Sequence, residues 1–193
     1  LSGLTRWTVT NLVVTNALVH FSEPGFELCV TGSLAVAADG VLAVGGNALR
    51  PRSAITSLYG PYFRYTDSTS APSITVSGDL VLTGGGLLHV YGAATNALTS
   101  PWGALVDIGG DLRVESSSAA YPVSHPTNGG SPLFRAASVH IVSGGSINAA
   151  SRGYVGVASG SSFGYGAGGA RSGGGYGGIG GYTGGGISYG SSN

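Results

Sequence analysis

The segment Val76-Ser77-Gly78-Asp79-Leu80-Val81-Leu82 is the clearest copy of a pattern that recurs along the chain. Apolar residues alternate on both sides of a small or polar turn, which predicts two short strands joined at a corner. Further copies are Val30 to Val36, Ile108 to Val114, Ala137 to Ile141 and, more weakly, Val9 to Val14. Internal repetition on this scale is typical of a solenoid.

The repeat has one anchor position, occupied by Leu12, Leu34, Leu80, Leu112 and Val139. These anchors are separated by 22, 46, 32 and 27 residues, about one coil of a β-helix plus variable loops. Each coil would contribute two or three short strands that pair in parallel with the coils above and below, about 4.8 Å away. The expected inward ladders are Leu34/Val36, Leu80/Leu82, Leu112/Val114 and Val139/Ile141, with Gly-Ser and Gly-Asp turns at the corners.

A second short strand follows several copies after a glycine-containing break, at 41–44, 87–90 and 147–149. We therefore predict an all-β fold, a right-handed parallel β-helix of about five irregular coils. The handedness follows from the strong preference of parallel crossovers for the right-handed form. A hairpin-based β-sandwich shows the same alternation and is the alternative fold.

The chain divides into a predicted β-solenoid over residues 1–150 and a Gly/Tyr-rich segment over 151–193. Long loops are expected near 50–73 and 116–131, where Pro, Ser and Tyr replace the apolar alternation. Loops on a solenoid tend to lie on one face and carry what binding there is.

Composition excludes several functional classes. Charged residues make up 8% of the chain, its formal net charge is zero, and its eight basic residues are all Arg. No basic stripe for nucleic acid can be assembled, and no apolar run is long enough for a membrane helix. A surface of Ser, Thr and Asn repels a second copy only weakly, which favours self-association. Because Met is absent, Leu1 is not expected to be the translated start, and the chain is processed, trimmed or part of a longer protein.

Metal, cofactor and thiol chemistry are not expected. Cys29, the single cysteine, lies in the apolar run Leu28-Cys29-Val30 and is interpreted as buried filler. His20, His89 and His140 lie in apolar strands without a metal-ligand spacing, so solvent-facing strand positions are expected for them.

An enzyme is the rival hypothesis, since β-helices host polysaccharide lyases and hydrolases. Asp79 and Asp111 share the Gly-Asp-Leu position of two copies, and stacked carboxylates suit acid/base chemistry. Aspartate after glycine is also what a corner requires, because its side chain accepts local backbone hydrogen bonds. The corner interpretation is favoured, and we predict no catalytic residue.

Glycine dominates the C-terminal segment, for example in Gly144-Gly145-Ser146-Ile147-Asn148-Ala149 and in Gly174-Gly175-Tyr176-Gly177-Gly178-Ile179-Gly180-Gly181. These stretches resemble the glycine-rich β-helix regions of large secreted bacterial surface proteins, the autotransporter passengers and haemagglutinin-type adhesins. The resemblance implies an extracellular or cell-surface location. It also implies a non-enzymatic structural role.

The aromatic rings of the glycine-rich segment are its only large anchors. Two interpretations stand side by side, a flexible linker and an element that packs subunits together. The subunit-packing candidates are Tyr154, Tyr165, Tyr176, Tyr182 and Tyr189.

A second aromatic group lies in and after the first long loop, at Tyr59, Tyr62, Phe63, Tyr65 and Trp102. It would serve either as a platform for sugar rings or as a cap over an open solenoid edge. The function we predict is a self-associating subunit or segment of a bacterial surface fibre or adhesin. A carbohydrate-binding β-helix module that contacts surface polysaccharide is the alternative.

Overall fold

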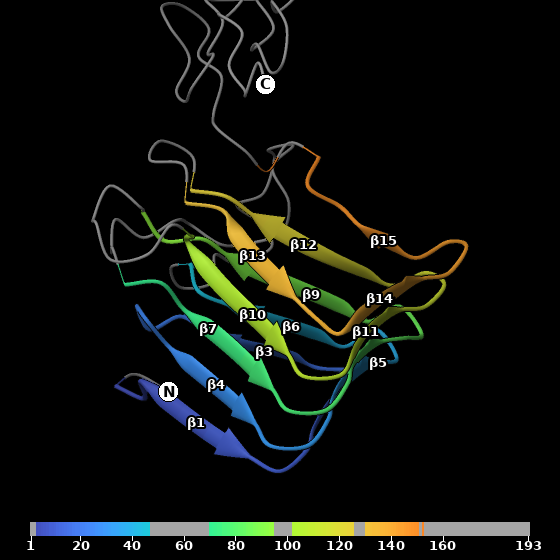
Figure 1. The fold of residues 1–193 in the computed structure, drawn as a ribbon, viewed down its shortest axis with the longest axis horizontal. Coiled ribbons are helices and arrows are strands. Elements are labelled where there is room, and N and C mark those ends of the chain that lie inside the picture. Colours follow the sequence, from blue (N-terminus) through green and yellow to red (C-terminus); the bar gives the residue numbers. More distant parts are fainter. Residues whose placement is uncertain (1–2, 47–69, 95–101, 126–129, 151, 153–193) are drawn as a thin grey trace, which may run out of the picture.

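A computed structural model describes residues 3–46, 70–94, 102–125, 130–150 and 152. In these ranges the chain forms fifteen strands and no helix. The strands make three parallel sheets of five strands each, and every strand pairing is parallel (Figure 1). The parallel pairing rules out the hairpin-based sandwich and confirms an all-β solenoid.

Every third strand of the chain belongs to the same sheet. Sheet A contains β1 (Arg6–Val9), β4 (Glu27–Val30), β7 (Ser73–Val76), β10 (Ala104–Ile108) and β13 (Pro132–Arg135). Sheet B contains β2 (Leu12–Thr15), β5 (Leu34–Ala37), β8 (Leu80–Leu82), β11 (Asp111–Val114) and β14 (Ser138–Ile141). Sheet C contains β3 (Leu18–Phe21), β6 (Val41–Val44), β9 (Leu87–Tyr91), β12 (Ala119–Val123) and β15 (Ser146–Ile147).

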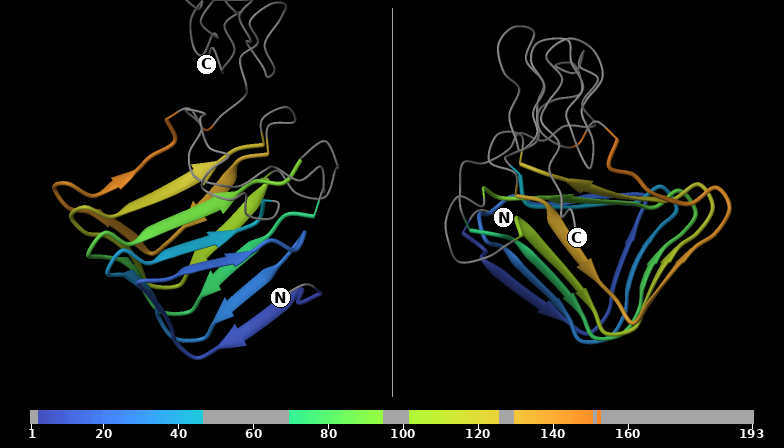
Figure 2. Two further views of the ribbon diagram at one scale, coloured as in Figure 1. Left: turned by 180° about the vertical axis from the view of Figure 1, so that it is seen from behind. Right: turned by 45° about the horizontal axis from the view of Figure 1, so that its top comes forward.

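One strand from each sheet makes one coil, so coil 1 is β1 to β3 and coil 5 is β13 to β15. Viewed along the stack, the three sheets enclose a triangular interior (Figure 2). β1 and β15 lie at opposite ends of the stack (Figure 1). The prediction of about five coils is confirmed for the described residues.

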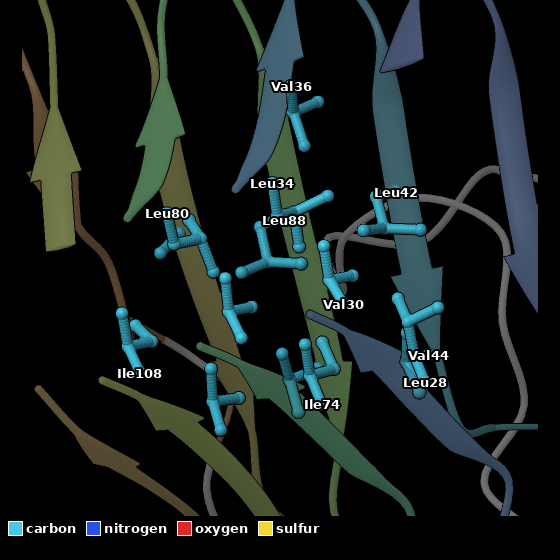
Figure 3. Close-up of a cluster of buried hydrophobic side chains, with 14 of the residues drawn as sticks. Leu28, Val30, Leu34, Val36, Leu42, Val44, Ile74, Leu80, Leu88 and Ile108 are labelled. Atoms are coloured by element: carbon cyan, nitrogen blue, oxygen red, sulfur yellow. The ribbon is translucent and has the colours of Figure 1, made fainter. Parts of the chain in front are cut away.

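The predicted anchor column is confirmed in register. Leu12 pairs with Leu34, Leu34 with Leu80, Leu80 with Leu112, and Leu112 with Val139. Such columns form because side chains alternate between the two faces of a strand, so every second residue points inward. Inward apolar residues of coils 2 and 3 have little or no exposure, among them Leu34, Leu80 and Leu88 (Figure 3). Burial of each leucine contributes roughly 1.5–3 kcal/mol.

The last predicted ladder pair behaves differently. Val139 and Ile141 continue the inward columns of Leu112 and Val114, but about half of each side chain is exposed. We expected both to be buried. They are exposed because coil 5 has no further described coil on its outer side.

The corner between sheets A and B explains the recurrent Gly-Asp-Leu. A Cβ atom added to Gly110 would overlap Asp79 Oδ1 of the preceding coil and would also press on the backbone of Gly78. Glycine is therefore required where the corner side chain of one coil reaches over the backbone of the next.

The corner between sheets C and A carries every long connection. It joins β6 to β7, β9 to β10 and β12 to β13, whereas the other two corners have short turns. Of the loop expected near 50–73, residues 50–69 lie outside the described residues, and Ser73 begins β7. The loop expected near 116–131 is shorter than predicted, because Ala119–Val123 pairs with β9 as β12.

Cys29 was expected to be buried, but it is only half-buried. It lies between the inward residues Leu28 and Val30, so its side chain points out of sheet A. The strict alternation of a strand therefore overrides the apolar character of the run.

Candidate functional surfaces

The corner between sheets A and B is built from a column of polar side chains. Asn11 Oδ1 accepts a hydrogen bond of 2.9 Å from the Ser33 amide, and Asp79 Oδ1 accepts one of 2.9 Å from the Asp111 amide. The Ser138 hydroxyl donates to Asp111 Oδ1. Each side chain thus holds the backbone or a corner residue of the next coil, which is the role expected of a corner aspartate.

Three chemically interesting groups meet at the end of this column. Ser138 Oγ lies 3.1 Å from His140 Nε2, and the same nitrogen lies 3.6 Å from Asp111 Oδ2. In a serine nucleophile site the histidine uses one nitrogen for the serine and the other for the carboxylate. Here one nitrogen faces both groups and the serine donates directly to the carboxylate, so the arrangement does not activate the hydroxyl.

Sequence reasoning missed this Ser-His-Asp cluster. The usable signal was the spacing of Ser138 and His140, two residues apart on one strand and hence on one face. Asp111 joins them because its partner across the sheet is Ser138. To predict that Asp111 lies beside Ser138, one must know how β11 and β14 are aligned. These two residues are 27 positions apart in the sequence, so a local pattern does not reveal the alignment.

The outer face of sheet C carries a histidine and tyrosine stack. His20, Ala43, His89 and Tyr121 occupy one outward column. The His89 ring stacks on Tyr121 with centroids 4.6 Å apart. We expected His89 to face solvent, but it is 1% exposed, which corrects that prediction.

Burial sets the protonation of these histidines. Removal from water, which disfavours the charged imidazolium, and the nearby Arg152 guanidinium together lower the pKa of His89 to about 4, with burial the larger cause. The pKa of His20 is also lowered by burial, partly offset by the hydrogen bond of 2.9 Å between its Nε2 and the Gly45 carbonyl. His89 is therefore neutral at pH 7 and acts as a packed ring rather than a charge.

Arg152 holds the end of coil 5 against this face. Its guanidinium lies 4.2 Å from the centre of the Tyr121 ring, a cation–π contact. Its carbonyl accepts a hydrogen bond of 2.8 Å from the Ser124 amide. The backbone hydrogen bonds between coils 4 and 5 thus extend beyond β12 to Ser124, at the corner between sheets C and A.

Trp102 is the described member of the predicted aromatic platform, and it is half-buried. The Arg135 guanidinium lies 6.0 Å from the centre of its ring and forms an ion pair of 3.0 Å with Asp107. Asp107 and Arg135 are partners across sheet A. An indole beside exposed hydrogen-bonding groups is an arrangement suited to a sugar.

The other predicted site residues fall in segments without described coordinates. The platform candidates Tyr59, Tyr62, Phe63 and Tyr65 lie outside the described residues. So do the subunit-packing candidates, which are Tyr154, Tyr165, Tyr176, Tyr182 and Tyr189.

The first and last coils of the described stack form two further surfaces. At the N-terminal end, the Phe21 ring stacks on Phe26 at 4.3 Å and lies 5.7 Å from Trp7. At the C-terminal end, Val139, Ile141 and Ile147 are 53%, 48% and 38% exposed. Inward apolar residues are therefore more exposed at the second end than at the first, where Trp7, Leu12 and Val19 are partly buried.

Comparisons of this chain with protein-family models, with curated proteins and with solved structures find no match. None of the described segments contains a helix long and apolar enough to cross a membrane. Within those same segments, no three His, Cys, Asp or Glu side chains are grouped as metal ligands.

Proposed function

We propose that this chain is a non-enzymatic structural segment of an extracellular bacterial surface fibre or adhesin, and that copies of it self-associate. The observation that carries the proposal is the uncovered end of the apolar columns in coil 5, at Val139, Ile141 and Ile147. Apolar surface of this kind is removed from water when another coil packs on it. The right-handed winding remains part of the proposal, on the general preference of parallel crossovers.

The mechanism is mechanical. Parallel backbone ladders between coils resist bending, and the interior columns resist separation of the sheets. The low charge favours contact with further copies, because few like charges repel. An extracellular location fits a surface made of uncharged polar residues.

A structural role for Asp79 and Asp111 supports the proposal that the chain is not an enzyme. Both carboxylates accept hydrogen bonds within the corner column. The double substitution Asp79→Asn and Asp111→Asn keeps the acceptor oxygens, so a structural segment should fold and associate like the parent. Loss of a polysaccharide-cleaving activity in this variant, with folding unchanged, would favour the enzyme.

Self-association is tested by light scattering and negative-stain electron microscopy of the full chain over a concentration series. Filaments or oligomers that grow with concentration support the proposal. Monodisperse particles at every concentration contradict it.

Carbohydrate binding is the second candidate, and Trp102 with the Asp107–Arg135 ion pair favours it. A sugar would stack on the indole and hydrogen-bond to the charged groups. Trp102→Ala should then abolish retention on immobilised polysaccharides, while Trp7→Phe, at the N-terminal end, should leave it unchanged. Equal retention of parent and Trp102→Ala would exclude this role for Trp102.

A further inference from the structure

Coil 5 is the last described coil. On its outer side, no described strand pairs with its backbone and no described coil covers its inward apolar residues. β13, β14 and β15 are edge strands of their sheets, each with a described neighbour on one side only. Val139, Ile141 and Ile147 continue the buried columns of Leu112, Val114 and Ala120. Such an edge fits another parallel coil that brings both apolar side chains and backbone hydrogen-bonding groups.

We infer that coil 1 of a second copy packs on coil 5, head to tail, in the register of the coils within one chain. This contact rests on the proposed self-association and specifies its surface. Coil 1 offers apolar residues in the same columns, because Leu12, Val14 and Val19 lead the columns that end at Val139, Ile141 and Ile147.

The match extends to sheet A. Trp7 begins the inward column that runs through Leu28, Ile74 and Val106 to Phe134. In the stacked pair Phe134 of one copy would lie beside Trp7 of the next, and aromatic pairs at this distance contribute beyond their burial. These four inward pairs are therefore apolar on both sides.

The outward-facing residues of coil 5 are also compatible with those of coil 1 in the next copy. Continuing the same register places Arg135 beside Thr8, His140 beside Val13 and Leu133 beside Arg6. None of these three pairs brings like charges together. Because the second copy docks in the same direction as the first, the contact does not close on itself and adds copies along one axis.

A cysteine pair tests this register on the surface. Val13 is 63% exposed, and the His140 side chain is 56% exposed, so both tolerate replacement. In the full chain carrying Cys29→Ser, we would introduce Val13→Cys and His140→Cys together. Neighbouring parallel strands lie about 4.8 Å apart, within the Cα separation that a disulfide spans.

Head-to-tail stacking predicts a ladder of covalent oligomers under mild oxidation, seen on non-reducing gels, for the double variant alone. Each single variant carries one thiol and should give no ladder. A dimer from His140→Cys alone would indicate tail-to-tail contact and overturn the inference. Association by light scattering without any ladder would overturn the inference and leave the proposed function standing.

A charge variant gives an independent measurement. Ile141→Lys should weaken association at least tenfold, because the ammonium would be buried in the contact. Thr75→Lys adds the same charge on the outer face of coil 3 and serves as the matched control. Equal association of the two variants would exclude the coil 5 end as the contact.

If the full chain stays monomeric at every concentration, the proposed self-association fails together with this inference. In that case the reaction of Ile141→Cys with a maleimide distinguishes two explanations. Slow labelling would indicate that residues 153–193 of the same chain cover the end. Fast labelling would indicate an end exposed to water that does not bind a second copy.

Discussion

The two ends of this solenoid use the same columns but differ in how well they cover them. In coil 1, Val14 and Phe21 are 3% and 9% exposed, although no described coil lies beyond them. In coil 5, Ile141, which ends the column of Val14, is 48% exposed, and Val139, which ends the column of the partly buried Leu12, is 53% exposed. At the N-terminal end the Phe21 ring contacts the rings of Phe26 and Trp7, and no aromatic side chain lies among Val139, Ile141 and Ile147 of coil 5.

This contrast shows that an open solenoid end is not an automatic consequence of the fold. Aromatic rings from Trp7, Phe21 and Phe26 shield part of coil 1 and leave Trp7, Leu12 and Val19 partly buried, whereas the β-branched residues of coil 5 are about half exposed. The C-terminal end therefore presents the larger apolar surface to the head-to-tail contact.

The largest expected effect separates the two ends directly. Phe21→Ala should lower the free energy of unfolding by about 3 kcal/mol, since it removes a buried ring and leaves a cavity. Ile141→Ala should cost about 1 kcal/mol or less, since half of that side chain is already in water. Urea unfolding of both variants at a concentration where the parent is monomeric checks this. Equal losses would remove the distinction between a closed and an open end.

Acid titration examines the middle of the stack, at His89 in coil 3. Its pKa of about 4 in the folded protein is below the ordinary value of 6.5, so the unfolded chain takes up the proton first as pH falls. The contribution of neutral His89 to the free energy of unfolding is therefore complete above pH 6.5. As the pH falls from 6.5 towards 4, the free energy of unfolding decreases by about 3 kcal/mol. Urea unfolding at several pH values measures the loss.

His89→Phe keeps a ring beside Tyr121 but binds no proton, so it should flatten the pH dependence over this window. A parental pH dependence in His89→Phe would show that other groups are responsible.

The corner glycines provide the next comparison. Gly110→Ala should cost about 2 kcal/mol, because the new methyl group would overlap Asp79 Oδ1 and press on the Gly78 backbone. Ala137 in coil 5, whose amide bonds to the Gly110 carbonyl, is exposed, so Ala137→Gly should cost well under 1 kcal/mol. Thermal unfolding of the two variants compares a covered corner with an open one.

The smallest expected effect concerns the polar column of the same corner. Asp79→Ala leaves the Asp111 amide without its acceptor and should cost about 1 kcal/mol, whereas Asp79→Asn should cost about half of that or less. Unfolding curves of the pair give the difference. If Asp79→Asn were as costly as Asp79→Ala, the charge and not the acceptor oxygen would matter.

Much of the fold was predictable because its signals are local and repeated. The anchor column from Leu12 to Val139 was identified by pattern alone and is confirmed in register. β12 was missed because its Ala-Ala-Tyr-Pro-Val sequence lacks the apolar alternation of the other copies. Its position depends on pairing with β9, 32 residues earlier in the chain.

The candidate surfaces were less predictable than the fold. The corner role of Asp79 was expected from Gly-Asp-Leu, since the turn needs a local acceptor. The contact of Ser138 and His140 with Asp111 was not, because it joins two coils. The platform and tail tyrosines stay predictions.

Local patterns are enough to predict that the side chains of this chain alternate, that it turns at glycine-containing corners and that it repeats with the length of one coil. Which of these equivalent positions are buried follows from the three-dimensional packing. His89 and His140 both lie in short strands with apolar neighbours, yet one is enclosed and the other is exposed. Burial depends on what lies across the sheet and beyond the coil, at distances along the chain that exceed the reach of any strand pattern.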